Sequence, residues 1–559
     1  MKNMIIGIEN FKEMIEDNVY YVDKTHLIED MFSNKVTLYT RPRRFGKTLN
    51  MSMLYYFFSN KEDGRELFKG LKITENTEMM KHMNQYPVIV MTLKDLRESS
   101  MESIYEYYAE MVSDLLGRHQ ELFESEKLND RDKELLRKYE YCECNPSQLK
   151  KALYYISRCL YLHYHKKVII LIDEYDVPLN YAYEKGYYDE MVEFISGIFS
   201  SALKTNEYLE KGALTGCLRV ARESIFTGMN NLRVRSIIDD DASDCFGFTQ
   251  DELDVFLEHY SLQEKEETFR TWYDGYLFGN TRIYNPWSVI NYIQDLNSHR
   301  KRSDDLNLRP KMYWANTSGN SIVYDYIMKS DENLKEEFKR LTEGQTIIKN
   351  IRPELTYREM NDIRNIYSFL LFTGYLNIVS PAYDESGSLI KNTYELACPN
   401  KEVREIFDDC FIDWFSKVHR HIESELISAL LDKNTDEATK LLNDFLFRSL
   451  SYYDYGEDKY HGLLLGLLNH DGYRAISNRE SGEGRYDLFM YKDFNSPSVI
   501  IECKKADSKE ELYSKAIEGI TQIRERRYIE GKQAEGFKKI IACSIAFYKK
   551  ECLILNIDS

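Results

Sequence analysis

Short apolar runs alternate with helical patterns along the first 240 residues of the chain. Four runs are β-prone, namely 35–40 ("KVTLYT"), 86–93 ("YPVIVMTL"), 168–172 ("VIILI") and 212–220 ("GALTGCLRV"). The third run is continuously apolar, which is typical of a central parallel strand covered on both faces. Helical periodicity follows the first run in "GKTLNMSMLYYFFSN". This alternation predicts a doubly wound α/β sheet domain at residues 1–240.

The hydrophobic pattern changes twice further along the chain. Residues 241–440 are mostly helical and contain aromatic islands such as "WYDGYLFGN", so we expect a middle or linker region there. These aromatic side chains either stack on bases or pack in a core, and packing is the preferred interpretation. Residues 441–559 read helix, strand, strand, helix, strand, with "YHGLLLGLL", "GRYDLFMY" and "SPSVIIECKK" as the first three elements. This order predicts a second α/β domain.

Composition and charge narrow the class of protein. The 559 residues are 43% hydrophobic and 30% charged, with a net charge of −18. This charge disfavours a surface covered by nucleic acid, although it leaves a local basic channel open. No apolar run approaches the roughly 18 residues of a membrane span. The ten cysteines are scattered without metal-ligand spacing, and no signal peptide is visible, so we expect a cytoplasmic protein with no membrane partner.

The stretch "TRPRRFGKTLNMS" ends in the pattern of a phosphate-binding loop. Gly46, Lys47 and Thr48 stand between a predicted strand and a predicted helix, where backbone N–H groups, an ammonium and a hydroxyl bind phosphates and Mg²⁺. Arg41 occupies the position of the usual first glycine, at a cost of about 1–3 kcal/mol if its backbone must be left-handed. We therefore expect an altered entry path, with Arg43 and Arg44 adding positive charge for a nucleotide.

The run "VIILIDEYD" supplies the acidic half of the predicted nucleotide site. Asp173 would lie at the carboxyl edge of the sheet and hold Mg²⁺, and Glu174 would orient and deprotonate the attacking water. An ordinary turn or helix cap is the alternative. Thr215 is a candidate sensor of the γ-phosphate. Arg219 and Arg222 are either phosphate sensors, including arginines that act in trans, or members of structural ion pairs.

Four separated motifs, "YVDKT", "RPRRFGKT", "LIDEYDVPLN" and "LTGCLRVARESIFTGMNNL", occur in order over residues 3–235. Together they resemble the AAA-ATPase-like family of P-loop NTPase domains. The resemblance implies that the arginine-rich loop is the family's ordinary form and that the domain binds ATP. It also leaves a homo-oligomer open, because such ATPases often place an arginine of a neighbouring subunit at the γ-phosphate.

A second candidate active site lies near the C-terminus. Asp487 lies on one predicted strand, and Glu502 and Lys504 share one face of the next strand because positions i and i+2 point the same way. Two converging carboxylates form a hard-oxygen site that suits Mg²⁺. The metal would activate water, and the lysine would position the nucleophile or stabilise the transition state. A cross-strand ion pair is the alternative.

The segments "YHGLLLGLL", "SNRESGEGRYDL", "IIECKK" and "AIEGITQIRERRY" resemble the PD-(D/E)XK nuclease superfamily over residues 440–555. The resemblance implies a restriction-endonuclease-like α/β domain in which Asp487, Glu502 and Lys504 hold the family's acidic and lysine positions. Weaker candidates for accessory roles are Glu457, Glu480 and Gln522. Tyr486 replaces the proline of the family's name, which is dispensable to the chemistry.

The two candidate sites together predict an enzyme. We expect an ATP-binding and ATP-hydrolysing protein coupled to a Mg²⁺-dependent nuclease that acts on nucleic acid, with DNA as the expected substrate. The alternative is a nucleotide-dependent switch whose nuclease-like domain binds DNA or protein without cutting.

Overall fold

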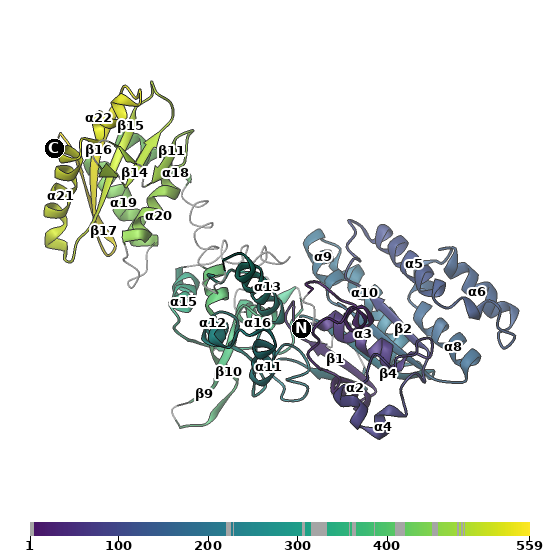
Figure 1. Cartoon of the computed structure of the whole chain (residues 1–559). Helices are drawn as coiled ribbons and strands as arrows, with labels where there is room; N and C mark the ends of the chain where they lie inside the picture. Colours follow the sequence, from purple (N-terminus) through teal and green to yellow (C-terminus); the bar gives the residue numbers. More distant parts are fainter. Residues whose placement is uncertain are drawn as a thin grey trace. The chain divides into compact units, whose positions relative to one another are not determined.

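The computed structural model describes two compact units, Met1–Phe407 and Asp408–Ser559 (Figure 1). The described residues are 5–219, 225–226, 229–303, 308–314, 332–356, 358–359, 365–384, 386–407, 420–449, 457–477, 480–481, 484–485 and 487–558. Within these ranges, no helix combines the length and the apolar character that a membrane crossing requires. The chain is a mixed α/β protein, as the sequence predicted.

A five-stranded parallel sheet forms the centre of the first unit, in the order β2-β3-β4-β1-β5. Its strands are β1 (Val36–Thr40), β2 (Val88–Thr92), β3 (Val168–Asp173), β4 (Leu209–Gly216) and β5 (Leu232–Arg235). Every residue of β1 and β3 is buried, as expected for strands covered on both faces. Because β4 lies between β1 and β3, the carboxyl ends of three strands meet at one edge of the sheet.

Helices surround this sheet. They are α1 (Phe11–Glu16), α2 (Leu27–Ser33), α3 (Lys47–Phe58), α4 (Thr77–Met80), α5 (Met101–Gly117), α6 (Asp130–Glu140), α7 (Pro146–Leu149), α8 (Ala152–Tyr164), α9 (Val177–Lys185) and α10 (Tyr188–Phe199). Helix α3 begins directly after the candidate phosphate loop and packs on β2 and β3. Eight of its twelve residues are buried, so it belongs to the core and fixes the loop that precedes it.

The remainder of the first unit is mostly helical, as predicted. Its helices are α11 (Gln250–Tyr260), α12 (Glu266–Tyr273), α13 (Pro286–Ser303), α15 (Glu332–Thr342) and α16 (Ile366–Thr373). The pattern did not predict its two small antiparallel sheets, β6 (Tyr276–Phe278) with β7 (Thr281–Ile283), and β8 (Ile347–Asn350) with β10 (Leu389–Ala397) and β9 (Asn377–Tyr383). Several aromatic residues of this region share one buried core, among them Trp272, Tyr273 and Tyr292.

The second unit contains a five-stranded mixed sheet in the order β11-β14-β15-β16-β17. The strands are β11 (Arg474–Ser477), β14 (Leu488–Tyr491), β15 (Ser498–Lys505), β16 (Ile540–Tyr548) and β17 (Glu551–Asn556), and a separate short pair is β12 (Glu480–Ser481) with β13 (Gly484–Arg485). The helices are α18 (Arg420–Leu431), α19 (Thr435–Ser449), α20 (Glu457–Leu467), α21 (Leu512–Glu525) and α22 (Tyr528–Ala534). Apolar clusters lie on both faces of the sheet.

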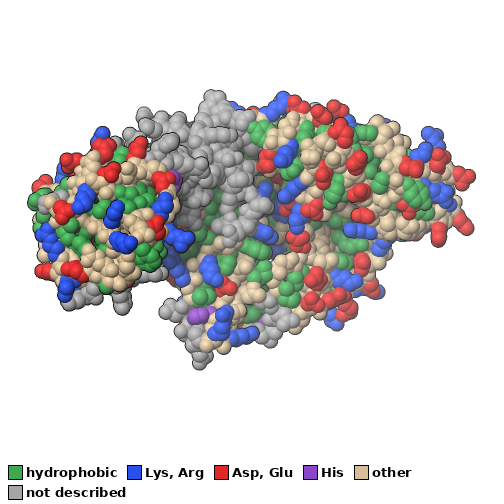
Figure 2. Space-filling model, turned by 90° about the horizontal axis from the view of Figure 1, so that it is seen from above, with side chains coloured by type: hydrophobic (Ala, Val, Ile, Leu, Met, Phe, Trp, Pro, Cys, Tyr) green, Lys and Arg blue, Asp and Glu red, His purple; other side chains and the backbone are tan. Residues whose placement is uncertain are grey.

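The compact units divide the chain at 407/408, whereas the sequence placed domain boundaries at 240/241 and 440/441. Helix α19 spans the second of these positions and packs on β17 of the C-terminal unit. Figure 2 shows acidic and basic side chains interspersed on the face in view, so the net charge of −18 is not gathered there in a single acidic patch.

Candidate active sites

The candidate phosphate loop joins the end of β1 to the start of α3. Gly46, the residue before α3, has a φ of +81°, and Arg44 is left-handed with a φ of +68°. Arg41 does not have a positive φ, so it does not carry the backbone strain of a left-handed conformation. In this loop the left-handed arginine is Arg44. The glycine that completes the pattern is therefore required by the backbone, while Arg41 is free to serve another purpose.

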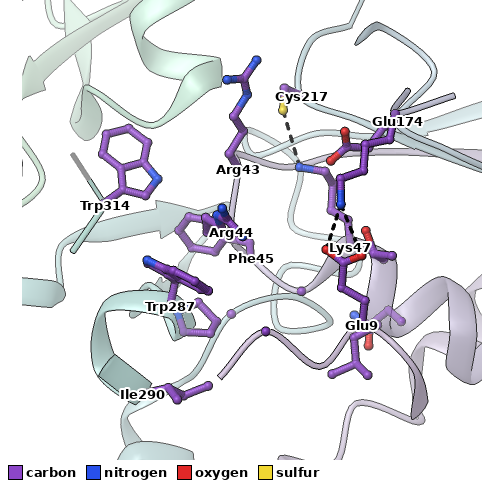
Figure 3. Close-up of a pocket in the computed structure, with 18 of the residues that line it drawn as sticks. Glu9, Arg43, Arg44, Phe45, Lys47, Glu174, Cys217, Trp287, Ile290 and Trp314 are labelled. Carbon is purple, nitrogen blue, oxygen red and sulfur yellow. Dashed lines mark hydrogen bonds and ion pairs between the residues drawn. The ribbon is translucent and has the colours of Figure 1, made fainter. Parts of the chain in front are cut away.

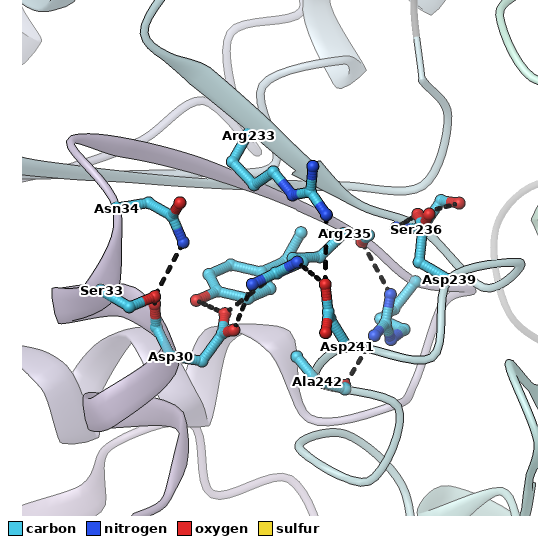
Figure 4. Close-up of polar contacts among 11 residues, drawn as sticks. Asp30, Ser33, Asn34, Arg233, Arg235, Ser236, Asp239, Asp241 and Ala242 are labelled. Carbon is cyan, nitrogen blue, oxygen red and sulfur yellow. Dashed lines mark hydrogen bonds and ion pairs between the residues drawn. The ribbon is translucent and has the colours of Figure 1, made fainter.

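Arg41 points into the protein interior. Its guanidinium is fully buried and donates to the carbonyl oxygens of Thr40, Arg235 and Ala242 at 2.9, 2.8 and 2.7 Å. Burial lowers its pKa to about 10. Figure 4 shows the corner of β5 and the following turn that it braces. The usual motif has a flexible glycine at this position. Arg41 instead connects the loop to the segment after β5 by hydrogen bonds.

The same corner contains a second arginine network. Arg235 is paired with Asp30 at 2.8 Å and also with Asp241 (Figure 4). Tyr39 of β1 donates its hydroxyl to Asp30 at 2.7 Å. These contacts join α2, β1 and β5 beside the loop, so the loop starts from a firmly held strand.

Lys47 is buried at the head of α3. Its ammonium donates to the carbonyl oxygens of Arg41 and Pro42 at 3.1 and 3.0 Å, and lies 3.5 Å from the Cys217 sulfur (Figure 3). Burial by itself lowers the pKa of Lys47, but Cys217, Glu174 and two further carboxylates outweigh burial and raise it. A charged ammonium is therefore held where a phosphate-binding loop requires one.

Asp173 joins the phosphate loop to the neighbouring strands. Thr48 donates its hydroxyl to one carboxylate oxygen at 2.7 Å, and Thr215 donates to the other. Burial raises the pKa of Asp173, and the two hydroxyl groups oppose that rise. The donor set of hydroxyl and carboxylate oxygens fits Mg²⁺, since this ion prefers hard oxygen ligands. Three residues that the sequence singled out, from α3, β3 and β4, thus meet at the Asp173 carboxylate.

Two further acidic residues follow Asp173. Glu174 is half-buried, has a φ of +52° and lines the cavity next to Lys47. Asp176 was not singled out from the sequence, yet its carboxylate accepts the backbone N–H groups of Cys217 and Leu218 at 2.9 Å each. Asp176 therefore fixes the segment after β4 against the start of α9, and the third acid of "DEYD" was the signal for it.

A cavity of about 310 Å³ opens at this edge of the sheet (Figure 3). The loop lines one part of it with Arg43, Arg44, Phe45, Gly46, Lys47 and Thr48. Aromatic and aliphatic residues from other elements line the rest, including Tyr20, Phe248, Trp287, Ile290 and Trp314. The Arg44 guanidinium lies 4.2 Å from the ring centre of Trp287. The cavity thus combines a cationic part with an apolar part, and the sequence did not identify the latter.

Arg219 and Thr215 do not line this cavity. Arg219 is paired with Glu354 at 2.5 Å, and its carbonyl oxygen accepts the N–H of Leu355 at 3.2 Å. Of the two possibilities left open for Arg219, the structure places it in an ion pair with the region that follows the sheet. Arg222 lies outside the described residues.

The candidate nuclease site lies where β14 and β15 run side by side. Leu488 is opposite Ile501, which places Asp487 beside the Glu502 end of β15. The Asp487 carboxylate accepts the N–H of Cys503 at 2.8 Å. Lys504 lies 3.1 Å from Glu502, as both side chains share one face of the strand. The three residues expected to act together are therefore neighbours.

Glu502 is almost completely buried, with 1% of its surface exposed. Burial and the nearby charge of Asp487 raise its pKa to about 7, and Lys504 opposes the rise. Its Oε2 atom is buried and has no hydrogen-bond partner among the described residues. A buried carboxylate oxygen without a partner is costly. Together with Asp487, this oxygen fits a divalent cation.

Supporting residues surround this pair of carboxylates. Gln522 of α21, an accessory candidate from the sequence, accepts a hydrogen bond from Lys504 at 2.7 Å. His461 of α20 lies 2.8 Å from the carbonyl oxygen of Asp487 and was not chosen as a site residue. The side chains of Glu457 and Glu480, and all of Tyr486, lie outside the described residues.

A third group of potential metal ligands lies in the first unit, where His26, Asp244 and Cys245 come together. His26 lies 3.3 Å from Asp244, and this hydrogen bond lowers the pKa of Asp244 to about 2. Lys24 donates to the carbonyl oxygen of Asp244 at 2.7 Å, and Arg41 is also close by. These cations disfavour a divalent ion, so the group is better explained as an ion-paired corner.

Comparison with known proteins identifies the families of two domains of the chain. One relative, described as "Uncharacterized protein in vnfD 5'region" from Azotobacter chroococcum mcd 1, is 24% identical over 417 residues, which cover 74% of this chain and 70% of the relative. A family model described as "Predicted AAA-ATPase" matches residues 5–226, and a model of the PD-(D/E)XK nuclease superfamily matches residues 455–556. The chain thus carries a predicted AAA-ATPase domain followed by a domain of the PD-(D/E)XK nuclease superfamily.

Proposed function

We propose that this protein binds and hydrolyses ATP in its first unit and cuts nucleic acid, with DNA as the expected substrate, in its second. The observation that carries the nuclease half is the Glu502 carboxylate, which is buried next to Asp487 and Lys504. One of its oxygens has no hydrogen-bond partner among the residues that the structure describes. A buried acid in that state suits a bound cation better than a purely structural role.

In the proposed nucleotide site, the N-terminus of α3 and the ammonium of Lys47 bind the phosphates. Thr48 and Asp173 would hold Mg²⁺, which neutralises charge on the phosphate oxygens when bound. Glu174 projects into the cavity and accepts the proton of the attacking water. Arg43 and Arg44 add positive charge at the loop, and the apolar side chains around Trp287 exclude water from the base.

In the proposed nuclease site, Asp487 and Glu502 would hold Mg²⁺, which supplies an activated water and stabilises charge on the phosphoryl oxygen when bound. Lys504 places an ammonium at the same point. Gln522 accepts from Lys504, so it keeps the ammonium directed at the carboxylates. His461 contacts the Asp487 backbone and so supports the turn that presents this carboxylate.

A homo-oligomer is part of the proposal. Because Arg219 is already paired with Glu354, a further arginine at the γ-phosphate, besides the cations of the loop, would come from elsewhere, and a neighbouring copy of the chain is one source. Light scattering should show a mass that increases when ATP and Mg²⁺ are added. An unchanged monomer mass with ATP bound would remove this part of the proposal.

Cleavage of mixed DNA and RNA substrates tests the nuclease assignment. Wild-type protein should cut with Mg²⁺ or Mn²⁺, and Lys504→Ala should not. Lys505→Ala is the matched control, because Lys505 is the next residue along β15 but is exposed. Binding without cutting by the wild type, over all substrates and metals, would instead favour a nucleotide-dependent switch with a nuclease-like binding module.

A further inference from the structure

Glu402 is a buried carboxylate close to, but outside, the lining of the nucleotide cavity. It lies in the helical residues 401–407, is completely buried and accepts two hydrogen bonds. One comes from the Ser288 hydroxyl at 2.7 Å and the other from the backbone N–H of Trp314 at 2.9 Å. Both donors belong to segments that line the cavity.

These two donors hold the tryptophans of the cavity wall. Trp287 precedes Ser288 in the first turn of α13, and its indole N–H donates to the carbonyl oxygen of Tyr313 at 3.0 Å. Trp287 and Trp314 both line the cavity (Figure 3). Glu402 therefore ties together two segments of chain that are separated by 26 residues and that each contribute one indole ring.

Burying the Glu402 carboxylate in its charged form is energetically unfavourable. Burial raises its pKa to about 7, and the hydrogen bonds from Trp314 and Ser288 oppose the rise. Among the described residues, no cation pairs with it, and the titratable groups that face it are Tyr273, Tyr276 and Tyr313. Burying an acid that is not paired with a cation costs free energy. This cost is best explained if both carboxylate oxygens are needed as hydrogen-bond acceptors.

We propose that Glu402 is a positioning residue of the nucleotide site, which sets Trp287 and Trp314 as the wall that receives the base of a purine nucleotide. This inference rests on the proposed function of the cavity and names the part of the ligand that Glu402 serves. The phosphates bind at the loop end, where Lys47 lies, whereas the indole rings provide flat apolar surfaces. Stacking of one base on an aromatic ring changes affinity by a factor on the order of 5 to 100.

Calorimetry with two ligands tests the inference, with ATP and inorganic tripolyphosphate each titrated with Mg²⁺ into full-length protein. Glu402→Ala should weaken ATP binding at least about fivefold and leave tripolyphosphate binding unchanged, because only ATP has a base. Glu402→Gln should bind ATP nearly as the wild type does. Its amide oxygen can accept from the Trp314 N–H and its amide nitrogen can donate to the Ser288 hydroxyl.

Glu405→Ala is the matched control, since Glu405 is a half-buried acid in the same helical segment and should leave both affinities unchanged. If Glu402→Ala fails to fold, Ser288→Ala removes one of the two hydrogen bonds and should weaken ATP binding alone by a smaller factor. Equal weakening of both ligands, or no change in ATP binding, would overturn the inference. If the wild type binds neither ligand, the proposed nucleotide site itself fails.

Discussion

The proposed nucleotide site and the proposed nuclease site are built in different ways. In the first, Thr48, Asp173 and Thr215 come from three elements far apart in the sequence, and both oxygens of Asp173 accept hydrogen bonds. In the second, Glu502 and Lys504 come from one strand, and one buried oxygen of Glu502 has no hydrogen-bond partner within the described part of the chain. Hydroxyl groups therefore satisfy the Asp173 carboxylate in the first site, whereas in our proposal a cation completes the second.

The largest expected effect is the loss of nucleic-acid cutting when the Glu502 carboxylate of the second site is replaced by a neutral amide. Glu502→Gln keeps the size of the side chain but removes the charge that would hold the metal, so cutting should fall by about 1,000-fold or more. ATP hydrolysis should stay near the wild-type rate. Gel assays of cleavage and phosphate release measure the two activities, and equal loss of both would mean that the sites are not separable.

The next effect belongs to the first site. Lys47→Ala removes the buried ammonium at the head of α3, so nucleotide affinity or turnover should fall by about 100-fold or more. Lys94→Ala is a useful control, because Lys94 also lines the cavity but is paired with Glu9 at 3.1 Å. Normal ATP binding and hydrolysis by the Lys47 variant would contradict the assignment of the loop.

Stability should distinguish two of the loop's three arginines, Arg41 and Arg44. Arg41→Ala leaves three carbonyl oxygens without a buried donor, at about 1 kcal/mol or more each, so unfolding free energy should fall by about 3 kcal/mol. Arg44→Ala removes an exposed contact with Trp287 and should cost less than about 1 kcal/mol. Urea denaturation measures both, and equal losses would show that Arg41 has no special structural role.

The smallest effect is a pH dependence that the second site should show. The Glu502 pKa is raised to about 7 from a usual value of 4.5. Stability from this group is therefore full below about pH 4.5 and is lost as pH rises through about 7, unless a cation is bound. Mg²⁺ affinity should rise about tenfold per unit up to pH 7 and then level off.

Calorimetric titration of Mg²⁺ without nucleotide, at pH 6, 7 and 8, measures this dependence. The Glu502→Gln variant is the control, since it lacks the titrating group and should show weak binding that does not change with pH. A wild-type affinity that is flat across this range would contradict the raised pKa as the cause.

Hydrophobic patterns in the sequence predicted those helices and strands whose own residues carry a strong pattern. The apolar run ending at Asp173 and the helix after Lys47 have strong patterns, and the structure contains both elements. Strand β5 was not predicted because its four residues, "LRVR", place an arginine at every second position. One of these, Arg235, is buried only because Asp30 and Asp241 pair with it, and sequence spacing does not show such partners.

The same limit applies to the candidate sites. Asp487, Glu502 and Lys504 could be grouped from spacing because adjacent strands bring them together. Trp287, Trp314 and Glu402 could not, since the fold of the whole first unit places them around the cavity. The orientation of the Arg41 side chain could not be predicted either. Its position in a loop motif does not determine whether the side chain faces the ligand or the core.

The most direct test of two separable sites measures ATP hydrolysis and DNA cleavage in the same preparations of wild type, Lys47→Ala and Lys504→Ala, all with Mg²⁺. We expect the Lys47 variant to lose ATP hydrolysis and the Lys504 variant to lose cleavage while it still hydrolyses ATP. Cleavage that survives unchanged in Lys504→Ala, or hydrolysis that survives unchanged in Lys47→Ala, would contradict the account.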